Sequence, residues 1–316
     1  MFAYIVRRLL VSIPTILAVT VVVFLLANLM PGNAVLAMLS TDSPAPEELI
    51  KLRQGQLGLD QPVPVQYARW LSNVAQGNLG RSFQYGDSVT AMIAQRIPAT
   101  LELMMVTLII SIFLGVALGT ISALRQYSSL DYGLTFIGFA GISIPDFFMG
   151  MILIFVFAIR LGWFPTSGMV TAGSEFSLPD NLRHIILPAL ALVRTAVFMR
   201  YTRASVLEVA KNDYVRTAQA KGLQRQLIIG RHILRNGLIP VITVVGLNMA
   251  ALFAGSVIIE TIFQWPGIGM MFINAVAVRD SPVIMGYVLL TTIFVLLVNL
   301  VTDITYSWVD PRIRYE

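Results

Sequence analysis

Four long stretches of this chain carry no charged side chain, and they limit its possible folds more than any other feature. A helix of roughly 20 apolar residues crosses the core of a bilayer, and each stretch is long enough to do so. Only 12% of the residues are charged, far below the roughly 25% of a soluble domain. We therefore predict an all-α, polytopic membrane protein. The stretches are Leu9–Thr41, Leu103–Leu124, Gly237–Ile259 and Ser281–Thr302.

Two further apolar segments are each interrupted by one charge. The segment Tyr132–Ile159 contains Asp146, and the segment after His184 contains Arg194. Counting both as spans predicts six transmembrane helices. Pro145 gives the first of them a reason to bend, because proline has no backbone donor. A charge inside a span is costly, so Asp146 and Arg194 are either a buried pair that packs the bundle or part of a pathway for a charged substrate.

The basic residues predict the orientation of the spans. With the amino terminus inside, the inner loops hold 13 of the 22 Lys and Arg residues, the short outer loops hold three, and the long outer loop holds five that the positive-inside rule discounts. We therefore expect both termini on the inner side. The net charge of +5 is explained by these loops, so no nucleic-acid partner is expected. The inner residues are Arg7, Arg8, Arg125, Arg200, Arg203, Lys211, Arg216, Lys221, Arg225, Arg231, Arg235, Arg312 and Arg314.

This orientation divides the chain into three regions. Residues 1–30 are expected to form the cytoplasmic amino terminus and the first span, residues 31–98 an extracytoplasmic helical loop region, and residues 99–316 the membrane core. In the outer region, apolar residues recur at three- and four-residue intervals, which predicts one helix with an apolar stripe that lies on the membrane surface or packs on the bundle. The stripe comprises Tyr67, Trp70, Leu71 and Val74.

The inner loop at 203–236 has the pattern of amphipathic helices. Basic residues alternate with Val206, Val215 and Ala218, so one side of the helix is apolar and the other is basic. The helix is predicted to end at Gly222, since glycine adopts a positive φ without a side-chain clash. Such a loop is suited either to anionic lipid or to a cytoplasmic partner.

The sequence contains no recognisable catalytic constellation. There is no cysteine and only two histidines, His184 and His232, so a protein metal site is not expected. The phosphate-binding loop Gly-x-x-x-x-Gly-Lys-Ser/Thr is absent, so we expect no ATP site in this chain and no enzymatic activity. Glu102 and Glu260 lie at predicted span ends, where we expect hydrated carboxylates. A transporter with this sequence needs a partner or an ion gradient as its energy source.

Several motifs resemble the dipeptide/oligopeptide permeases of binding-protein-dependent ABC importers. They occur in the order of that family, they extend from end to end of the chain, and they lie on the expected sides of the membrane. The resemblance implies a type I ABC importer permease fold in a bacterial-type inner membrane. The motifs are Leu57–Tyr67, Gly77–Phe83, Arg96–Leu103, Asp213–Gly222, Arg231–Gly237, Glu260–Gly269 and Asp310–Arg314.

The resemblance also implies that Asp213–Gly222 contains the coupling helix, which docks on a cytoplasmic ATPase subunit. Related importers carry Glu-Ala-Ala here, followed four residues later by glycine. Ala218 and Gly222 match this spacing, whereas Arg216 stands at the glutamate position and Thr217 at the first alanine. We expect small Thr217, Ala218 and Ala220 to allow close approach of the partner. The predicted coupling residues are Asp213, Tyr214, Arg216, Thr217, Ala218, Gln219, Ala220, Lys221 and Gly222.

The resemblance implies the function as well. The chain would form half of a peptide pathway, together with a second homologous permease, two cytoplasmic ATPase subunits that bind ATP and Mg, and an extracytoplasmic substrate-binding protein. The substrate could be a dipeptide, a longer peptide, a glutathione-like peptide or a nickel chelate. The alternative is an ion-coupled secondary transporter of small polar solutes, whose coupling site normally shows paired ionisable groups near the middle of the bilayer.

Overall fold

The structure is a computed structural model that describes residues 2–29, 48, 51, 52, 55, 58 and 60–309. Helices dominate the described residues, and their only strand-like pairing is an isolated bridge between Arg81 and Ser88. Within the part of the chain that the structure describes, four helices are long and apolar enough to cross a membrane, or up to six if each of two bent pairs is one span. The all-α fold predicted from the sequence is therefore confirmed, and the motif Asp310–Arg314 lies outside the described residues.

The chain forms two compact units, and the division falls within α5 (Val89–Leu124) and α15 (Ser281–Val309). Unit 1 comprises Met1–Thr100 and Pro266–Leu297. It contains α1 (Phe2–Leu29), α4 (Val63–Ala75) and α14 (Ile268–Ala277). Because α5 begins at Val89, the expected boundary between residues 98 and 99 falls inside a helix.

The predicted stripe on α4 packs on α1. Pro62 precedes the helix and Pro64 lies in its first turn, where proline is tolerated because the first amides have no acceptor within the helix. The Tyr67 ring meets Phe24 edge-on with centroids 5.4 Å apart, and the Tyr67 hydroxyl lies 3.0 Å from Thr20 Oγ1. Trp70 stands 6.5 Å from the same Phe24 ring. Of the two placements that the sequence allowed, the stripe therefore packs on a neighbouring helix.

A buried carboxylate organises the loop before α5 in unit 1. Asp280 is only 1% exposed and accepts hydrogen bonds from the Ser82 hydroxyl, from the Phe83 amide at 3.0 Å and from the Gln84 amide at 3.3 Å. The Tyr85 amide in turn donates to Ser82 Oγ at 2.9 Å. The polar end of the Gly77–Phe83 motif is thus fixed to the turn between α14 and α15.

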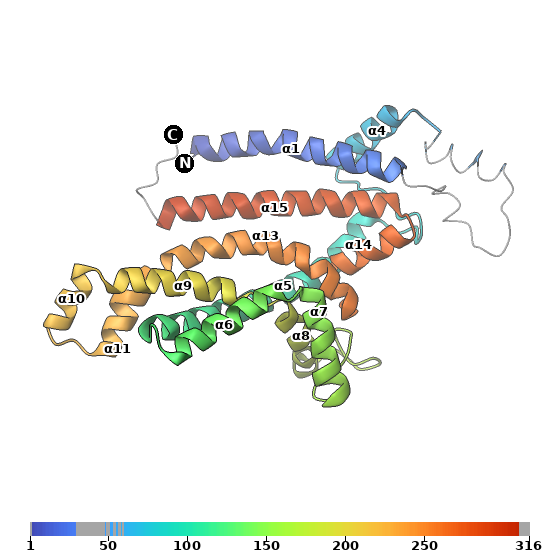
Figure 1. Cartoon of the computed structure of the whole chain (residues 1–316). Helices are drawn as coiled ribbons and strands as arrows, with labels where there is room; N and C mark the ends of the chain where they lie inside the picture. Colours follow the sequence, from blue (N-terminus) through green and yellow to red (C-terminus); the bar gives the residue numbers. More distant parts are fainter. Residues whose placement is uncertain are drawn as a thin grey trace. The chain divides into compact units, whose positions relative to one another are not determined.

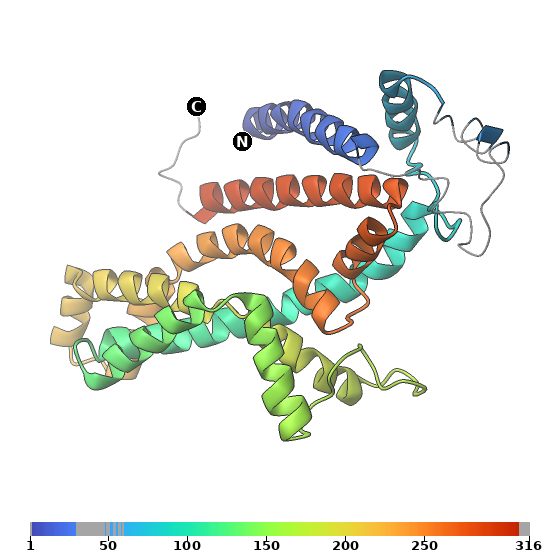
Figure 2. The ribbon, with the colours of Figure 1, turned by 45° about the vertical axis from the view of Figure 1, so that its right-hand side comes forward.

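Unit 2 comprises Leu101–Trp265 and Val298–Glu316 and contains both bent pairs. In the first pair, α6 (Ser129–Ser143) and α7 (Asp146–Leu153), which continues as the π-helix η1 (Ile154–Arg160), meet at 104°. In the second, α8 (Leu178–Leu192) and α9 (Thr195–Ala210) meet at 62°. Figures 1 and 2 both show α7 turning away from α6.

The first break has the cause that the sequence predicted. Ile144 precedes Pro145 and is extended, with φ −88° and ψ 124°, because a residue before proline avoids the helical region. The second break follows an extended Val193 and precedes Arg194. Both interruptions therefore place a charged residue beside a helix end, where backbone groups lack helical partners.

The remaining elements of unit 2 surround α9. Gly115 and Gly119 let α5 approach α9 closely, since a Cβ on Gly119 would stand 2.6 Å from the Met199 carbonyl oxygen. The long helix α13 (Ile239–Ile262) has Pro240 in its first turn. Glu260, expected to be hydrated, is instead fully buried, so that expectation was wrong. Between α9 and α13 lie α10 (Asp213–Ala220), α11 (Arg225–Leu227), η2 (Ile228–Leu234) and α12 (Arg235–Gly237).

Candidate functional site

The short helix α10 lies at the end of α9 and closes as the sequence predicted (Figure 1). Gly222 has φ +72°, its amide donates to the Gln219 carbonyl at 3.0 Å, and the Leu223 amide donates to the Ala218 carbonyl at 3.4 Å. This pair of bonds is the Schellman arrangement, which satisfies the last carbonyls of a helix. A Cβ on Gly222 would meet nothing within 4 Å, so the backbone angle alone favours glycine there.

Two residues anchor α10 and leave the rest of it exposed. Val215 and Ala218 are 0% and 5% exposed, and they pack with Val206, Ile228 and Ile233. Ala218 is therefore unavailable to a partner, contrary to the expectation that it allows close approach. The other predicted coupling residues are exposed, namely Asp213, Tyr214, Arg216, Thr217, Gln219, Ala220, Lys221 and Gly222.

Polar contacts fix the exposed side of α10. The Tyr214 hydroxyl accepts from the Asn236 amide group at 3.3 Å, which joins α10 to α12. Arg216, at the position where related importers carry glutamate, lies 3.9 Å from the Asp213 carboxylate within the same helix. Both members of this ion pair are largely exposed, so it contributes little stability. The outer face of α10 is thus a small polar surface with both signs of charge.

The residues inside the bent spans form two Asp–Arg pairs rather than one. Asp146, the first residue of α7, lies beside Arg194, with 3.3 Å between Arg194 Nη2 and Asp146 Oδ2. Their side chains are 38% and 29% exposed. The Arg194 backbone amide donates to Ser111 Oγ of α5 at 3.0 Å, and Gly255 of α13 lies against both charged groups.

The second pair was not found from the sequence, which assigned Arg203 only to an inner loop. Asp131 of α6 accepts hydrogen bonds from Arg203 Nε at 2.9 Å and from Arg203 Nη2 at 2.8 Å, which makes a bidentate ion pair. It also accepts from the Ser122 hydroxyl and from the Tyr127 amide at 3.0 Å. Its side chain is 3% exposed. The Ser128 hydroxyl accepts from the Asp131 amide and caps the start of α6, so this local pattern predicts the start of the helix and not the partner of Asp131.

The two pairs lie along one groove between α6 and α9. A cavity of about 320 Å³ is lined by Asp131, Arg200 and Arg203, and a second cavity of about 270 Å³ is lined by Asp146 and Arg194. The cavities share four lining residues, so we treat them as one α6–α9 groove. The shared residues are Gly138, Ile142, Ala196 and Met199.

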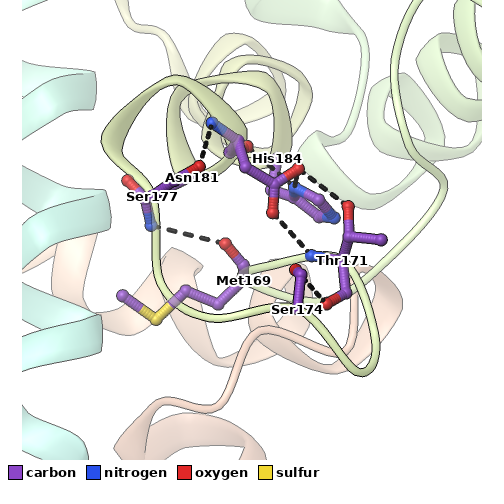
Figure 3. A network of polar contacts seen from close by, with 7 residues as sticks. Met169, Thr171, Ser174, Ser177, Asn181 and His184 are labelled. Carbon is purple, nitrogen blue, oxygen red and sulfur yellow. Dashed lines mark hydrogen bonds and ion pairs between the residues drawn. The ribbon is translucent and has the colours of Figure 1, made fainter.

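A separate polar network fixes the loop that leads into α8 (Figure 3). The Asp180 carboxylate accepts from the Thr171 amide and from the Thr171 hydroxyl, each at 2.7 Å. His184 Nδ1 lies 2.9 Å from the Asp180 carbonyl oxygen, and the Asn181 side chain donates to the Met169 carbonyl at 3.4 Å. The buried His184 is thus part of a loop anchor. Within the described residues, no three His, Asp or Glu side chains gather as metal ligands do.

Comparison with known proteins identifies the family. Residues 115–315 match the inner membrane component of binding-protein-dependent transport systems, and residues 1–104 match the amino-terminal part of such components. The chain belongs to this family of transport permeases. An inward-facing structure of the methionine ABC transporter MetNI has the same fold, with a TM-score of 0.55 and 14% identity over 69% of this chain and 96% of that chain. The type I importer permease fold implied by the motifs is therefore confirmed.

Relatives align over the whole chain. An oligopeptide transport system permease of Bacillus subtilis is 42% identical over 320 residues, and a di/tripeptide transport system permease of Pseudomonas aeruginosa is 40% identical over 336 residues. A glutathione transport system permease of Escherichia coli is 40% identical over 318 residues. Each of the three alignments covers 100% of both chains.

Proposed function

We propose that this chain is the permease subunit of an ATP-driven peptide importer and forms half of its translocation pathway. Its family and its peptide-transporting relatives support this function. The geometric observation that carries it is α10, an exposed polar helix held by two buried residues and closed by Gly222. This is a suitable docking element for a protein that supplies energy, because the chain itself has no phosphate-binding loop.

The assembly that follows contains a second homologous permease, two cytoplasmic ATPase subunits that bind ATP and Mg, and an extracytoplasmic substrate-binding protein. Both termini and α10 lie on the cytoplasmic side. ATP-driven closure of the ATPase subunits moves α10, and α9 carries this motion to the bent spans. Such switching requires contacts that differ between the two states of the transporter. The substrate undergoes no covalent change.

Gly222→Val tests the coupling role of α10. A β-branched residue at positive φ costs on the order of 1–3 kcal/mol in backbone strain, so the end of α10 should shift and the ATPase subunits should dock poorly. Co-purification of the ATPase subunits and peptide-stimulated ATP hydrolysis should both fall. Gly173→Val is a matched control, since Gly173 has φ +82° and no atom within 4 Å of its Cβ position but lies outside the α10 loop. Normal docking and transport by the Gly222 variant would refute the proposal.

The orientation can be tested separately because the chain has no cysteine. Single substitutions Ser72→Cys and Gln224→Cys place thiols at exposed positions of α4 and of the loop after α10. An impermeant maleimide added to intact cells should label the first and leave the second unlabelled until the membrane is opened. Labelling of both from the same side would contradict the proposed topology.

The alternative of an ion-coupled transporter makes a different prediction. Membrane vesicles that contain this chain alone would then accumulate substrate when a proton gradient is imposed. For an ATP-driven importer, uptake should require ATP inside, the ATPase subunits and the binding protein. Uptake that persists under a proton gradient without ATP would favour the alternative.

A further inference from the structure

We propose that the Asp146–Arg194 pair is an openable contact for the charged termini of a peptide in transit. The two side chains separate, Arg194 binds the terminal carboxylate, and Asp146 binds the terminal ammonium group. This inference rests on the proposed function as a peptide importer. It assigns a substrate site to the membrane subunit itself, within the α6–α9 groove.

The first support is that the pair is loosely made. Arginine and carboxylate groups bind best through two parallel hydrogen bonds, yet Asp146 and Arg194 share a single contact of 3.3 Å. Arg194 Nε is buried with no hydrogen-bond partner among the described residues, and so is Thr195 Oγ1. A buried donor without an acceptor costs roughly 1–3 kcal/mol, so the closed pair leaves Arg194 incompletely satisfied.

The second support is where the pair lies. Both side chains are about one-third exposed and line a cavity of about 270 Å³. Each charge lies at the break of a bent span, and a charged residue at the centre of a helix in lipid costs roughly 2.5–3.5 kcal/mol on insertion scales. The cavity side of the groove must therefore face water or protein. Since this chain is a transport permease, a water-filled pathway meets that requirement.

The third support is that the chemistry of the site matches a zwitterion. The guanidinium of Arg194 provides a positive charge and planar N–H donors for a carboxylate. Asp146 provides the negative charge for an ammonium group. A dipeptide spans at most about 7 Å, so short peptides can use both contacts at once, whereas longer ones must bend or use them in turn.

Other positions in the groove do not offer these properties. Asp131 already accepts four hydrogen bonds, and Arg203 contributes two of them, so that pair has little capacity left. Arg200 lines only the Asp131 end of the groove.

Gly141 lines the Asp146 end and is exposed, and a Cβ there would meet nothing within 4 Å. Gly141 is therefore a suitable position for a cysteine that reports whether the groove is occupied.

The test is substrate protection of a thiol at Gly141. The Gly141→Cys variant is purified in complex with the second permease and the two ATPase subunits, without the binding protein, and its modification by a small methanethiosulfonate reagent is timed. Millimolar alanyl-alanine should slow modification several-fold, and the same dipeptide acetylated and amidated at its ends should not. Equal protection by both peptides, or by neither, would overturn the inference. The assay needs no binding protein, so recognition by that protein cannot produce the result.

Variants link the protection to the pair. Asp146→Asn combined with Arg194→Gln leaves no unpaired charge and should abolish protection, whereas the matched control Arg200→Gln should retain it. If the double variant fails to assemble, Arg194→Lys serves instead, and it should weaken protection because lysine lacks the planar fork. Protection that survives in each assembled variant would also contradict the inference.

The failure of this inference is distinguishable from failure of the proposed function. ATP-dependent uptake of alanyl-alanine by the unmodified transporter is measured in parallel. Uptake without charge-dependent protection would overturn only the peptide contact at Asp146 and Arg194. Absence of ATP-dependent peptide uptake would overturn the proposed function.

Discussion

The two Asp–Arg pairs of the groove use the same residue types and differ in what surrounds the carboxylate. Both arginine side chains are 29% exposed, but Asp146 is 38% exposed and Asp131 only 3%. The described residues give Asp131 four donors and Asp146 one. The buried Asp131 carboxylate requires several hydrogen-bond donors, because a charge removed from water is costly unless it is paired and hydrogen-bonded. The partly exposed Asp146 carboxylate can be hydrated instead.

The difference separates two mechanical roles. The Asp131–Arg203 pair joins α6 to α9 on the side that leads to α10, and it can transmit a displacement because opening it would strand a buried charge. The Asp146–Arg194 pair can open at low cost, since water or a ligand can replace each partner. The Asp131–Arg203 pair is thus a fixed contact close to α10, where the ATPase subunits are proposed to dock. The Asp146–Arg194 pair is a contact that can open along the proposed peptide pathway.

The largest effect is expected from Asp131→Ala. It leaves Arg203 without its partner and deprives the Ser122 hydroxyl and the Tyr127 amide of an acceptor. Breaking a buried pair typically costs about 3–5 kcal/mol, so the yield and melting temperature of the chain should fall sharply. The double variant Asp131→Ala with Arg203→Ala should recover part of the loss. A single variant as stable as the parent would remove the distinction between the pairs.

A smaller effect is expected from Ser122→Ala. The substitution removes one of four donors to Asp131, and a hydrogen bond to a charged group is worth roughly 1.5–3 kcal/mol. Thermal unfolding of the purified chain measures the change. Ser143→Ala is the matched control, since Ser143 is exposed and donates only to the Phe139 carbonyl of its own helix at 2.9 Å. Equal melting temperatures for the two variants would mean that Asp131 does not need its full set of donors.

Substitutions in the Asp146–Arg194 pair should affect peptide transport more than stability, whereas substitutions around Asp131 should mainly affect stability. Arg194→Ala is expected to lower stability by only about 1 kcal/mol, because both partners reach solvent, and to reduce peptide uptake strongly. Yield, melting temperature and uptake per molecule are measured together. A fully active Arg194→Ala transporter would remove the pathway role. A poorly expressed variant that is rescued by Asp146→Ala would instead make the pair structural.

Much of this arrangement could be predicted from local sequence signals. Pro145 fixes an extended residue before it and so predicts the first bend, and Gly222 predicts the end of α10. The three-residue interval between Val215 and Ala218 places both on the apolar side, and both are buried. The inward position of Ala218 follows from that same interval, whereas the resemblance to related importers implies contact with a partner.

The missed features depend on tertiary contacts. Arg203 and Asp131 are 72 residues apart, and no local pattern connects them. Glu260 lies next to an apolar run, which suggests a hydrated end, but it is fully buried in unit 2. Hydropathy indicates where a span ends and cannot show whether neighbouring helices cover that end. The burial of individual charged residues such as Asp131 and Glu260 therefore becomes known only from the structure.

The smallest effect on stability is expected from Gly255→Ala, at the point where α13 passes the Asp146–Arg194 pair. A Cβ on Gly255 would stand 3.3 Å from Asp146 Oδ2 and 3.6 Å from Arg194 Nη2, and both are ends of flexible, partly exposed side chains. Gly255→Ala should push the pair slightly apart, and the gain in helix propensity of up to about 1 kcal/mol should offset the crowding.

Gly119→Ala is the contrasting variant because its Cβ would stand 2.6 Å from the Met199 carbonyl oxygen, which cannot rotate away. Overpacking of that kind costs about 1–3 kcal/mol. The melting temperature should therefore fall for Gly119→Ala and stay nearly constant for Gly255→Ala, while thiol modification at Gly141→Cys becomes faster in the Gly255→Ala background. A melting temperature lowered equally by both substitutions would show that the Asp146–Arg194 pair is as rigid as the packed helix contact, and that a peptide could not open it.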